Sequence, residues 1–296
     1  MESLAQLWNT LPVALRDPVA LAVPVFVLLL VLESVAAVAL EEQVEDRPGK
    51  GSYARQDAIA SISMGAVSIA TLAFWKFLAL IGYAALWAYV APWHLDPRDW
   101  TTWVVAILGV DLLFYLEHRI AHRVRVIWAT HQAHHSSEYF NFATALRQKW
   151  NNSAEIVMWL PLPLLGVPPW MVFTSFSINL VYQFFVHTEH VGRLWRPVEL
   201  VMNTPSHHRV HHGCDPLYLD RNYAGIFIVW DRLFGTFQEE VHRPTYGLTK
   251  PVGTHRILRL QTHEYAAILR DVRHSPRWRD KLGHLFGPPG WGPSAP

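Results

Sequence analysis

Histidines are the residues of this chain most capable of chemistry, because 11 of its 17 lie between positions 118 and 212. His118 and His122 form an HxxxH pair, and residues four apart lie on one face of a helix. An HxxHH pattern begins at His131 and recurs at His208. We expect the three imidazoles of each pattern to share a helical face. This repeated spacing predicts imidazoles that converge on metal ions.

Metal binding also removes an electrostatic problem that crowded histidines create. Protonated imidazoles repel at close range, whereas a metal ion binds the neutral base. A zinc ion takes three or four protein ligands, so about eight to ten imidazoles predict two ions. Imidazole suits iron, zinc and copper, so the type of ligand leaves the element open. A ferritin-like site would need two Glu-x-x-His motifs, and only Glu239 to His242 fits that spacing.

Carboxylates near the histidines are candidates for orienting the imidazoles through their second ring nitrogen. We expect Asp111 and Glu138 to act in this way. Asp111 lies in an apolar segment, where an ionisable side chain is functional by default. Glu33 also lies in an apolar segment, and there the alternative is a side chain that reaches the membrane surface. Further candidates by sequence distance are Glu117, Glu189 and Asp231.

The elements that must position the histidines are predicted to be membrane helices. Hydrophobic residues make up 51% of the chain and charged residues 17%, against about 25% charged in soluble domains. Residues 18–40 carry one charge, and a helix of that length rises about 34 Å, enough for a hydrocarbon core of about 30 Å. The sequence Ala37-Val38-Ala39 imitates a signal-peptidase site, but the length of the run favours a retained anchor.

Three further apolar segments follow. Residues 58–90 would span about 50 Å as one helix, so one long tilted helix and two shorter ones both stay open. Residues 100–117 run directly into His118. Residues 155–186 contain GVPPW, whose two prolines force a turn and predict a helical hairpin that dips into the membrane.

Basic residues predict the orientation of these segments. They follow the first apolar run and surround the early histidines: Arg47, Lys50 and Arg55, then Arg119, Arg123, Arg125, Arg147 and Lys149. The positive-inside rule places both regions in the cytoplasm. The expected fold class is therefore an all-α integral membrane protein, with about four transmembrane or hairpin helices and a His-rich helical cytosolic cap.

We expect three parts along the chain. Residues 1–117 form the N-terminal membrane helices, and residues 118–250 form a His-rich di-metal domain that includes the hairpin. Residues 251–296 form an amphipathic helix over residues 256–281, either near anionic headgroups or on the cap, and a Pro/Gly-rich tail. The net charge of +1 gives no reason to expect nucleic acid as a partner. A single cysteine, Cys214, excludes an intramolecular disulfide and a Cys-rich zinc site.

Five stretches together resemble the sterol desaturase/fatty acid hydroxylase superfamily: HRIAH, HQAHHSSEYFNFATALRQ, QFFVHTEHVGRL, NTPSHHRVHHG and YLDRNYAGIFIVWDRLFGTFQEE. The resemblance covers Asp111 to Glu240 and is strongest to the branch of the alkylglycerol monooxygenases and their bacterial relatives. One departure is Leu116, where the family pattern has an aromatic residue. That departure concerns packing more than metal ligation.

The resemblance implies an integral membrane enzyme that takes a lipid from the bilayer, binds two iron ions and uses O₂ to hydroxylate, desaturate or oxidatively cleave the lipid. It implies an external electron donor, either a tetrahydropterin or a redox protein. The implied metal ligands are His118, His122, His131, His134, His135, His187, His208, His211 and His212. His207 matches a further histidine position and is expected as a ligand or beside the ligands. The role of His190 stays open.

Two other functions stay open on the residues alone. A dinuclear zinc hydrolase of the membrane would also use imidazoles to activate water. A metal transporter or sensor would bind metal without catalysis. Aromatic residues that flank the histidines are candidates for a lipid path or for ordinary packing: Tyr139, Phe140, Phe142, Phe184 and Phe185. Ether cleavage through a hemiacetal and hydroxylation of a sterol or acyl chain need the same ligands.

Overall fold

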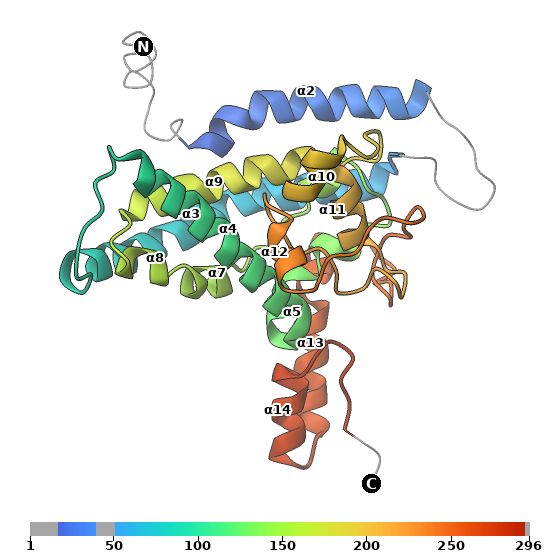
Figure 1. Ribbon diagram of the computed structural model, residues 1–296. Helices are drawn as coiled ribbons and strands as arrows, with labels where there is room; N and C mark the ends of the chain where they lie inside the picture. The colour runs from blue at the N-terminus through green and yellow to red at the C-terminus, as the bar shows by residue number, and fades with distance from the viewer. Residues whose placement is uncertain (1–16, 40–50, 294–296) are drawn as a thin grey trace.

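The computed structural model describes residues 17–39 and 51–293, and this part of the chain is helical without a strand (Figure 1). Two isolated β-bridges, Met202–Phe227 and Gly213–Tyr246, are the exceptions within those residues. Pro48 and Gly49, whose residue types predict a break in any helix, lie outside the described residues. The described part of the Pro/Gly-rich tail, residues 287–293, has no helix.

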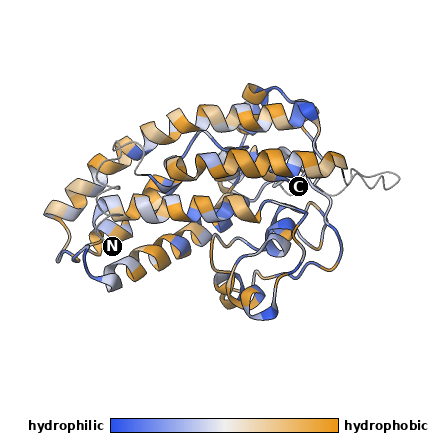
Figure 2. Cartoon of the chain, turned by 90° about the horizontal axis from the view of Figure 1, so that it is seen from above, coloured by the Kyte–Doolittle hydropathy of each residue, from blue (hydrophilic) through white to orange (hydrophobic). Residues whose placement is uncertain are grey.

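Four long helices run alongside one another: α2 (Pro18–Ala39), α3 (Arg55–Tyr89), α4 (Trp100–Arg123) and α9 (Pro169–Val186) (Figure 1). Apolar residues cover much of their length, as Figure 2 shows. Residues 58–89 of the segment that the sequence left open belong to the single 35-residue helix α3, and Val90 caps its end. This segment contains no proline, so nothing in it removes a backbone donor from the helix.

Within the described residues, α2 and α3 are the helices long and apolar enough to cross a membrane. The sequence predicted about four such helices, and the described residues contain two. Helix α9 packs against both of them, and α4 packs against α9. Large apolar side chains are exposed on both helices, including Val35 at 61% and Ile69 at 71%. An apolar surface of this kind is what lipid would cover.

The hairpin predicted around GVPPW is present. The short helices α7 (Ser153–Met158) and α8 (Pro161–Leu164) precede the turn, and α9 follows it. Gly166 has a φ of +83°, in the left-handed region that favours glycine. Pro169 starts α9, where its missing N–H has no helical partner to lose.

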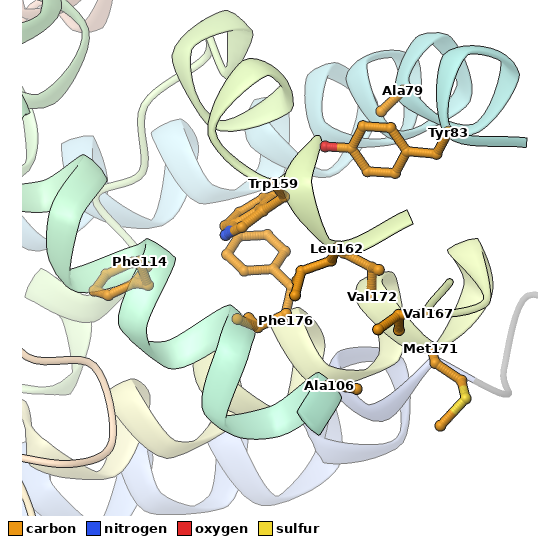
Figure 3. Close-up of a cluster of buried hydrophobic side chains, with 11 residues drawn as sticks. Ala79, Tyr83, Ala106, Phe114, Trp159, Leu162, Val167, Met171, Val172 and Phe176 are labelled. Atoms are coloured by element: carbon orange, nitrogen blue, oxygen red, sulfur yellow. The ribbon is translucent and has the colours of Figure 1, made fainter. Parts of the chain in front are cut away.

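The main apolar core joins this hairpin to α3 and α4 (Figure 3). Trp159 and Phe176 pack with ring centroids 4.3 Å apart. The Tyr83 hydroxyl donates a hydrogen bond to the Ile156 carbonyl at 2.7 Å, which ties α3 to α7. This core packs α3, α4 and α9 together through the hairpin. It thereby sets the position of α4, which carries the first two clustered histidines.

Short elements gather around the ends of the long helices that carry the histidines. They are α5 (Arg125–His131), the 3₁₀ helix η2 (His134–Ser136), α6 (Phe142–Ala145), α10 (Arg196–Val201), α11 (Pro205–His212) and α12 (Val229–Leu233). The boundary predicted between residues 117 and 118 falls inside α4, which continues from its apolar part through His118 and His122.

The C-terminal region forms two helices, α13 (Ile257–His274) and α14 (Trp278–Phe286), which project from the body (Figure 1). The sequence predicted one helix over residues 256–281. The helix stops at His274 because Pro276 disfavours helical geometry in the residue before it and cannot donate a backbone hydrogen bond. Arg125 fastens α13 to α5 through ion pairs with Glu264 and Asp271, at 2.7 and 2.8 Å.

Candidate metal centre

Nine buried histidines form two adjacent groups. The first group is His118, His122, His131, His135 and His211, and the second is His134, His187, His208 and His212. Within each group the candidate ligand atoms all lie within 4.8 Å of one another. The groups touch, because the rings of His135 and His212 have centroids 4.5 Å apart. Nine of the ten predicted ligands are thus brought together.

The first and last histidines of each motif, four residues apart, share a group, whereas the histidine three residues after the first joins the other group. His131 and His135 lie in the first group, but His134 lies in the second. His208 and His212 lie in the second group, but His211 lies in the first. Each HxxHH motif therefore links the two groups, which differs from the single shared face expected for its three imidazoles.

Backbone carbonyls fix the orientation of four rings. The Nδ1 atoms involved lie 2.6–3.1 Å from carbonyl oxygens, in the pairs His118–Tyr223, His134–Arg147, His187–Gln183 and His211–Arg221. A carbonyl oxygen only accepts, so each Nδ1 carries the proton and donates it. In the neutral ring, Nε2 then offers a lone pair to the centre of the cluster.

Four Nε2 atoms of the first group form a chain of close contacts: His118–His131 at 3.0 Å, His131–His135 at 3.0 Å and His135–His211 at 3.2 Å. His118 and His211 present lone pairs, so His131 and His135 would both have to donate. Their own Nε2 protons would then face each other. No arrangement of protons on four neutral imidazoles satisfies all three contacts, whereas a cation among the lone pairs does.

Burial keeps these imidazoles neutral. Removal from water lowers the pKa of His131, His134 and His135 well below the ordinary histidine value. It lowers the pKa of His211 to about 4, although the hydrogen bond to the Arg221 carbonyl opposes the shift. At neutral pH the rings are therefore in the form that binds metal.

Buried ring nitrogens that lack hydrogen bonds support the same assignment. His122 Nε2 and His212 Nε2 are buried without a partner among the described residues, as is His208 Nδ1. An unpaired buried polar atom is costly, and a metal ion would satisfy it. Two adjacent sets of imidazoles with unpaired nitrogens fit two transition-metal ions, and ligand type alone suits iron, zinc or copper.

His207 lies outside both groups. Its Nε2 is 2.9 Å from a carboxylate oxygen of Glu199, and its Nδ1 accepts a hydrogen bond from the Thr204 N–H at 3.4 Å. Both ring nitrogens are thus engaged at the start of α11, so this ring orients the helix that carries His208. The His190 side chain is exposed and packs beside Gly51, also outside the two groups.

Asp111 is fully buried but holds a loop rather than a histidine. It accepts hydrogen bonds from Ile226 N–H, Phe227 N–H, Trp230 Nε1 and Asn179 Nδ2, at 2.7–3.0 Å. Asp231 accepts from Tyr223 N–H and Ala224 N–H in the same loop, each at 2.8 Å. The two carboxylates therefore fix the Tyr223 carbonyl that orients His118.

The other carboxylates expected near the histidines have different partners. Glu138 is exposed and lies beside Gly247, with no hydrogen bond to a clustered histidine in the described part of the chain. Glu189 accepts from Tyr246 and Arg243. Glu33 is buried on α2 and accepts from Tyr53, Phe142 N–H and Thr188, so it does not reach the membrane surface.

Sequence reasoning missed Arg147, whose side chain is 1% exposed. Its carbonyl orients His134, and its guanidinium pairs with Asp57 of α3 at 2.5 Å. The arginine was visible in the sequence as part of the histidine-flanking basic set. Its carbonyl contact had no sequence signal, because every residue carries the same backbone acceptor.

A cavity of about 510 Å³ leads to the histidines from between α2 and α3. Val27 of α2 and Ile69 of α3 line it and are 58% and 71% exposed, so its mouth opens on the outer surface of the helices. At its inner end lie four clustered histidines, which are His118, His131, His134 and His187. Of the aromatic residues predicted for a lipid path, Phe184 lines this cavity.

Apolar helices and two touching groups of buried imidazoles define a helical, membrane-associated class of protein with a site that fits two metal ions. Residues 103–236 match the sequence model of the fatty acid hydroxylase family.

Several characterised proteins are also similar in sequence to this chain. Alkylglycerol monooxygenase from Homo sapiens is 40% identical over 95% of this chain and 61% of its own length. The Danio rerio alkylglycerol monooxygenase is 41% identical over 81% of this chain and 54% of its own length. Ornithine lipid hydroxylase from Rhizobium tropici is 26% identical over 75% of this chain and 69% of its own length. The chain therefore spans somewhat more than half of the alkylglycerol monooxygenases, and no solved structure matches it.

Proposed function

We propose that this chain is an O₂-dependent di-iron lipid monooxygenase of the membrane. The observation that carries the proposal is the cavity, because it joins a lipid-facing mouth between α2 and α3 to the two histidine groups. An alkyl chain entering from the bilayer would bring a C–H bond to the metal-binding end without crossing water.

The proposed ligands are the nine histidines of the two groups, five for one iron and four for the other. With two reduced irons bound, these residues would hold a centre whose chemistry is the activation of O₂, in the overall conversion of R–H, O₂, two electrons and two protons to R–OH and water. We leave His207 out of the ligand set because both its ring nitrogens are engaged elsewhere.

The residues of the chain contribute orientation and exclusion of water. Carbonyls of Tyr223, Arg147, Gln183 and Arg221 hold four imidazoles with Nε2 inward. Apolar side chains of α2, α3 and α9 form most of the cavity wall and exclude water from the reacting carbon. In this scheme Asp111 is a positioning residue, acting on His118 through the loop that contains Tyr223.

The relatives indicate the class of substrate. Their names specify an alkylglycerol in one case and an ornithine lipid in another, and both are lipids. For an ether lipid, oxidation of the carbon beside the ether oxygen gives a hemiacetal, which separates into an aldehyde and an alcohol. We favour this reaction because of the alkylglycerol monooxygenases, and hydroxylation of a sterol or acyl chain is the alternative outcome.

The proposed placement has α2 and α3 crossing the membrane, with α4 and the α7–α9 hairpin packed beside them. Residues 1–117 then supply membrane helices, residues 118–250 the catalytic domain and residues 251–296 a peripheral part. The basic residues around the histidines support a metal site at the cytoplasmic face, because the positive-inside rule favours them there. An external donor, a tetrahydropterin or a redox protein, would supply electrons from that side.

Lipid mass spectrometry with ¹⁸O₂ tests the reaction. Iron-loaded protein and a reductant are incubated with candidate lipids, and His134→Ala is the matched inactive variant. Label in an aldehyde trapped by reduction would support ether cleavage, and label in a hydroxylated chain would support hydroxylation. Two bound zinc ions, with lipid cleavage that needs no O₂, would instead support the zinc hydrolase. Metal flux in proteoliposomes without lipid turnover would support a transporter.

A further inference from the structure

The wall of the lipid cavity contains a polar patch among its apolar residues. Glu117, Lys149, Asn152 and Glu155 all line the cavity, and all are buried or nearly so. Glu117 immediately precedes the candidate ligand His118 on α4. The patch therefore lies beside the metal-binding end of the cavity rather than at its lipid-facing mouth.

Lys149 is held between two carboxylates. Its Nζ lies 3.2 Å from Glu117 Oε1 and 2.6 Å from Glu155 Oε1. The two carboxylates raise its pKa despite burial, so Lys149 is a charged ammonium with three N–H donors. Two donors are used by Glu117 and Glu155, which leaves one donor available in the described structure.

Asn152 supplies the complementary group. Its Nδ2 donates to Glu155 Oε2 at 2.7 Å, whereas its Oδ1 is buried and accepts no hydrogen bond among the described residues. The side chain therefore has an unused acceptor in a residue that is 7% exposed. Lys149 and Asn152 occupy the two oxygens of one carboxylate, so the spare donor and the spare acceptor are neighbours.

A hydroxyl group donates one hydrogen bond and accepts others, so it matches this pair. We propose that Lys149 and Asn152 bind a free hydroxyl group of the lipid, which enters the cavity polar end first and leaves its alkyl chain toward the mouth between α2 and α3. This inference rests on the proposed lipid-oxidising function and makes the two residues determinants of its specificity. With the hydroxyl-bearing head group held there, the alkyl carbon that adjoins the head group would lie beside the histidines.

Selective binding of a hydroxylated lipid tests the proposal. The probes are 1-O-hexadecylglycerol and its 2,3-di-O-methyl derivative, which keeps the ether and the alkyl chain but has no hydroxyl donor. Each displaces radiolabelled 1-O-hexadecylglycerol from iron-loaded protein in one detergent, under argon and without reductant. The measured quantity is the dissociation constant of the dimethyl derivative divided by that of 1-O-hexadecylglycerol. Comparison of this ratio between variants cancels the different partitioning of the two lipids into detergent.

We expect Asn152→Leu to reduce the ratio about tenfold, because a site built to bind a hydroxyl discriminates strongly against an analogue that lacks it. Asn151→Leu is the matched control. Asn151 is the adjacent asparagine, bonds to Tyr265 and does not line the cavity, so the wild-type ratio should persist. Asn152→Ala removes the same acceptor with less bulk and should behave like Asn152→Leu.

An unchanged ratio in a folded Asn152→Ala or Asn152→Leu protein would overturn the proposal, and so would an equal loss in Asn151→Leu. A water molecule held permanently by Lys149 and Asn152 would give the first of these results. The measurement needs no turnover. Selective binding without incorporation of ¹⁸O would therefore count against the proposed reaction alone, whereas incorporation without a role for Asn152 would count against this inference alone.

Discussion

Thr188, the residue after the candidate ligand His187, donates a hydrogen bond to Glu33 of α2 at 2.5 Å. Glu33 also accepts from Tyr53 and from the Phe142 N–H. A charged residue in the most apolar helix thus links that helix to three segments around the metal centre. This arrangement explains why an ionisable group is retained in a helix that otherwise faces lipid.

Glu33→Leu should destabilise the protein and reduce its metal content. The substitution leaves three donors without an acceptor, and each unpaired buried donor costs about 1–3 kcal/mol. Thermal unfolding in detergent and bound iron per chain measure the effect. Ser34→Ala, at a half-buried neighbouring position whose hydroxyl bonds only to the Val31 carbonyl of its own helix, should change neither quantity. A stable Glu33→Leu protein with full metal content would show that the linkage is unimportant.

Adjacent histidines on α11 should behave differently. His208→Ala should lose at least one of two bound irons, because His208 belongs to the second histidine group. His207→Ala should keep both irons while unfolding at a lower temperature, because His207 bonds to Glu199 and Thr204 instead. Metal analysis by mass spectrometry distinguishes the two variants. Loss of iron in a folded His207→Ala protein would restore His207 to the ligand set.

Removal of the metal should destabilise the fold. Without a cation, the Nε2 atoms of His131 and His135 lie 3.0 Å apart with no consistent arrangement of protons. A ligand present at a thousand times its dissociation constant stabilises the folded state by about 4 kcal/mol. Chelator-treated protein should therefore unfold several degrees lower, and added Fe²⁺ under argon should restore the midpoint. Equal midpoints with and without iron would contradict the proposed metal centre.

Asp111→Asn should cost about 3 kcal/mol of unfolding free energy, because an amide group would face the four donors that the carboxylate now accepts from. Asp99→Asn provides the comparison on the same helix. Asp99 caps α4 by accepting from Thr101 N–H, and an asparagine oxygen accepts the same hydrogen bond, so this variant should keep nearly the wild-type stability. Thermal unfolding of both variants tests the order, and a smaller effect at Asp111 would refute the role assigned to its loop contacts.

Narrowing the cavity should reduce lipid turnover without removing metal. Ala66 of α3 lines the cavity, and Ala66→Phe would occupy space that an alkyl chain needs. We expect a fall of about tenfold or more in kcat/KM for a hexadecyl substrate, with unchanged iron content. Ala70→Phe, one turn further along α3, is exposed and does not line the cavity. Equal activity of the two variants would exclude this cavity as the substrate path.

Local patterns in the sequence predicted much of this structure. The turn at GVPPW follows from the backbone limits of proline and glycine, and the long helices follow from runs of apolar residues. Pairing of His118 with His122 follows from helical periodicity. The single helix predicted over residues 256–281 was wrong, although the position of Pro276 within it could have indicated the break.

What the sequence by itself determined is the kind of chemistry, because residue type and spacing are local properties: many neutral imidazoles at helical intervals next to apolar helices. Only the tertiary structure decided the division into two groups, since His134 and His211 each join a group assembled mainly from other segments. It also separated His207 from His208 and matched Nδ1 atoms to distant carbonyls. These outcomes depend on how helices cross in space, and every backbone carbonyl looks alike in a sequence.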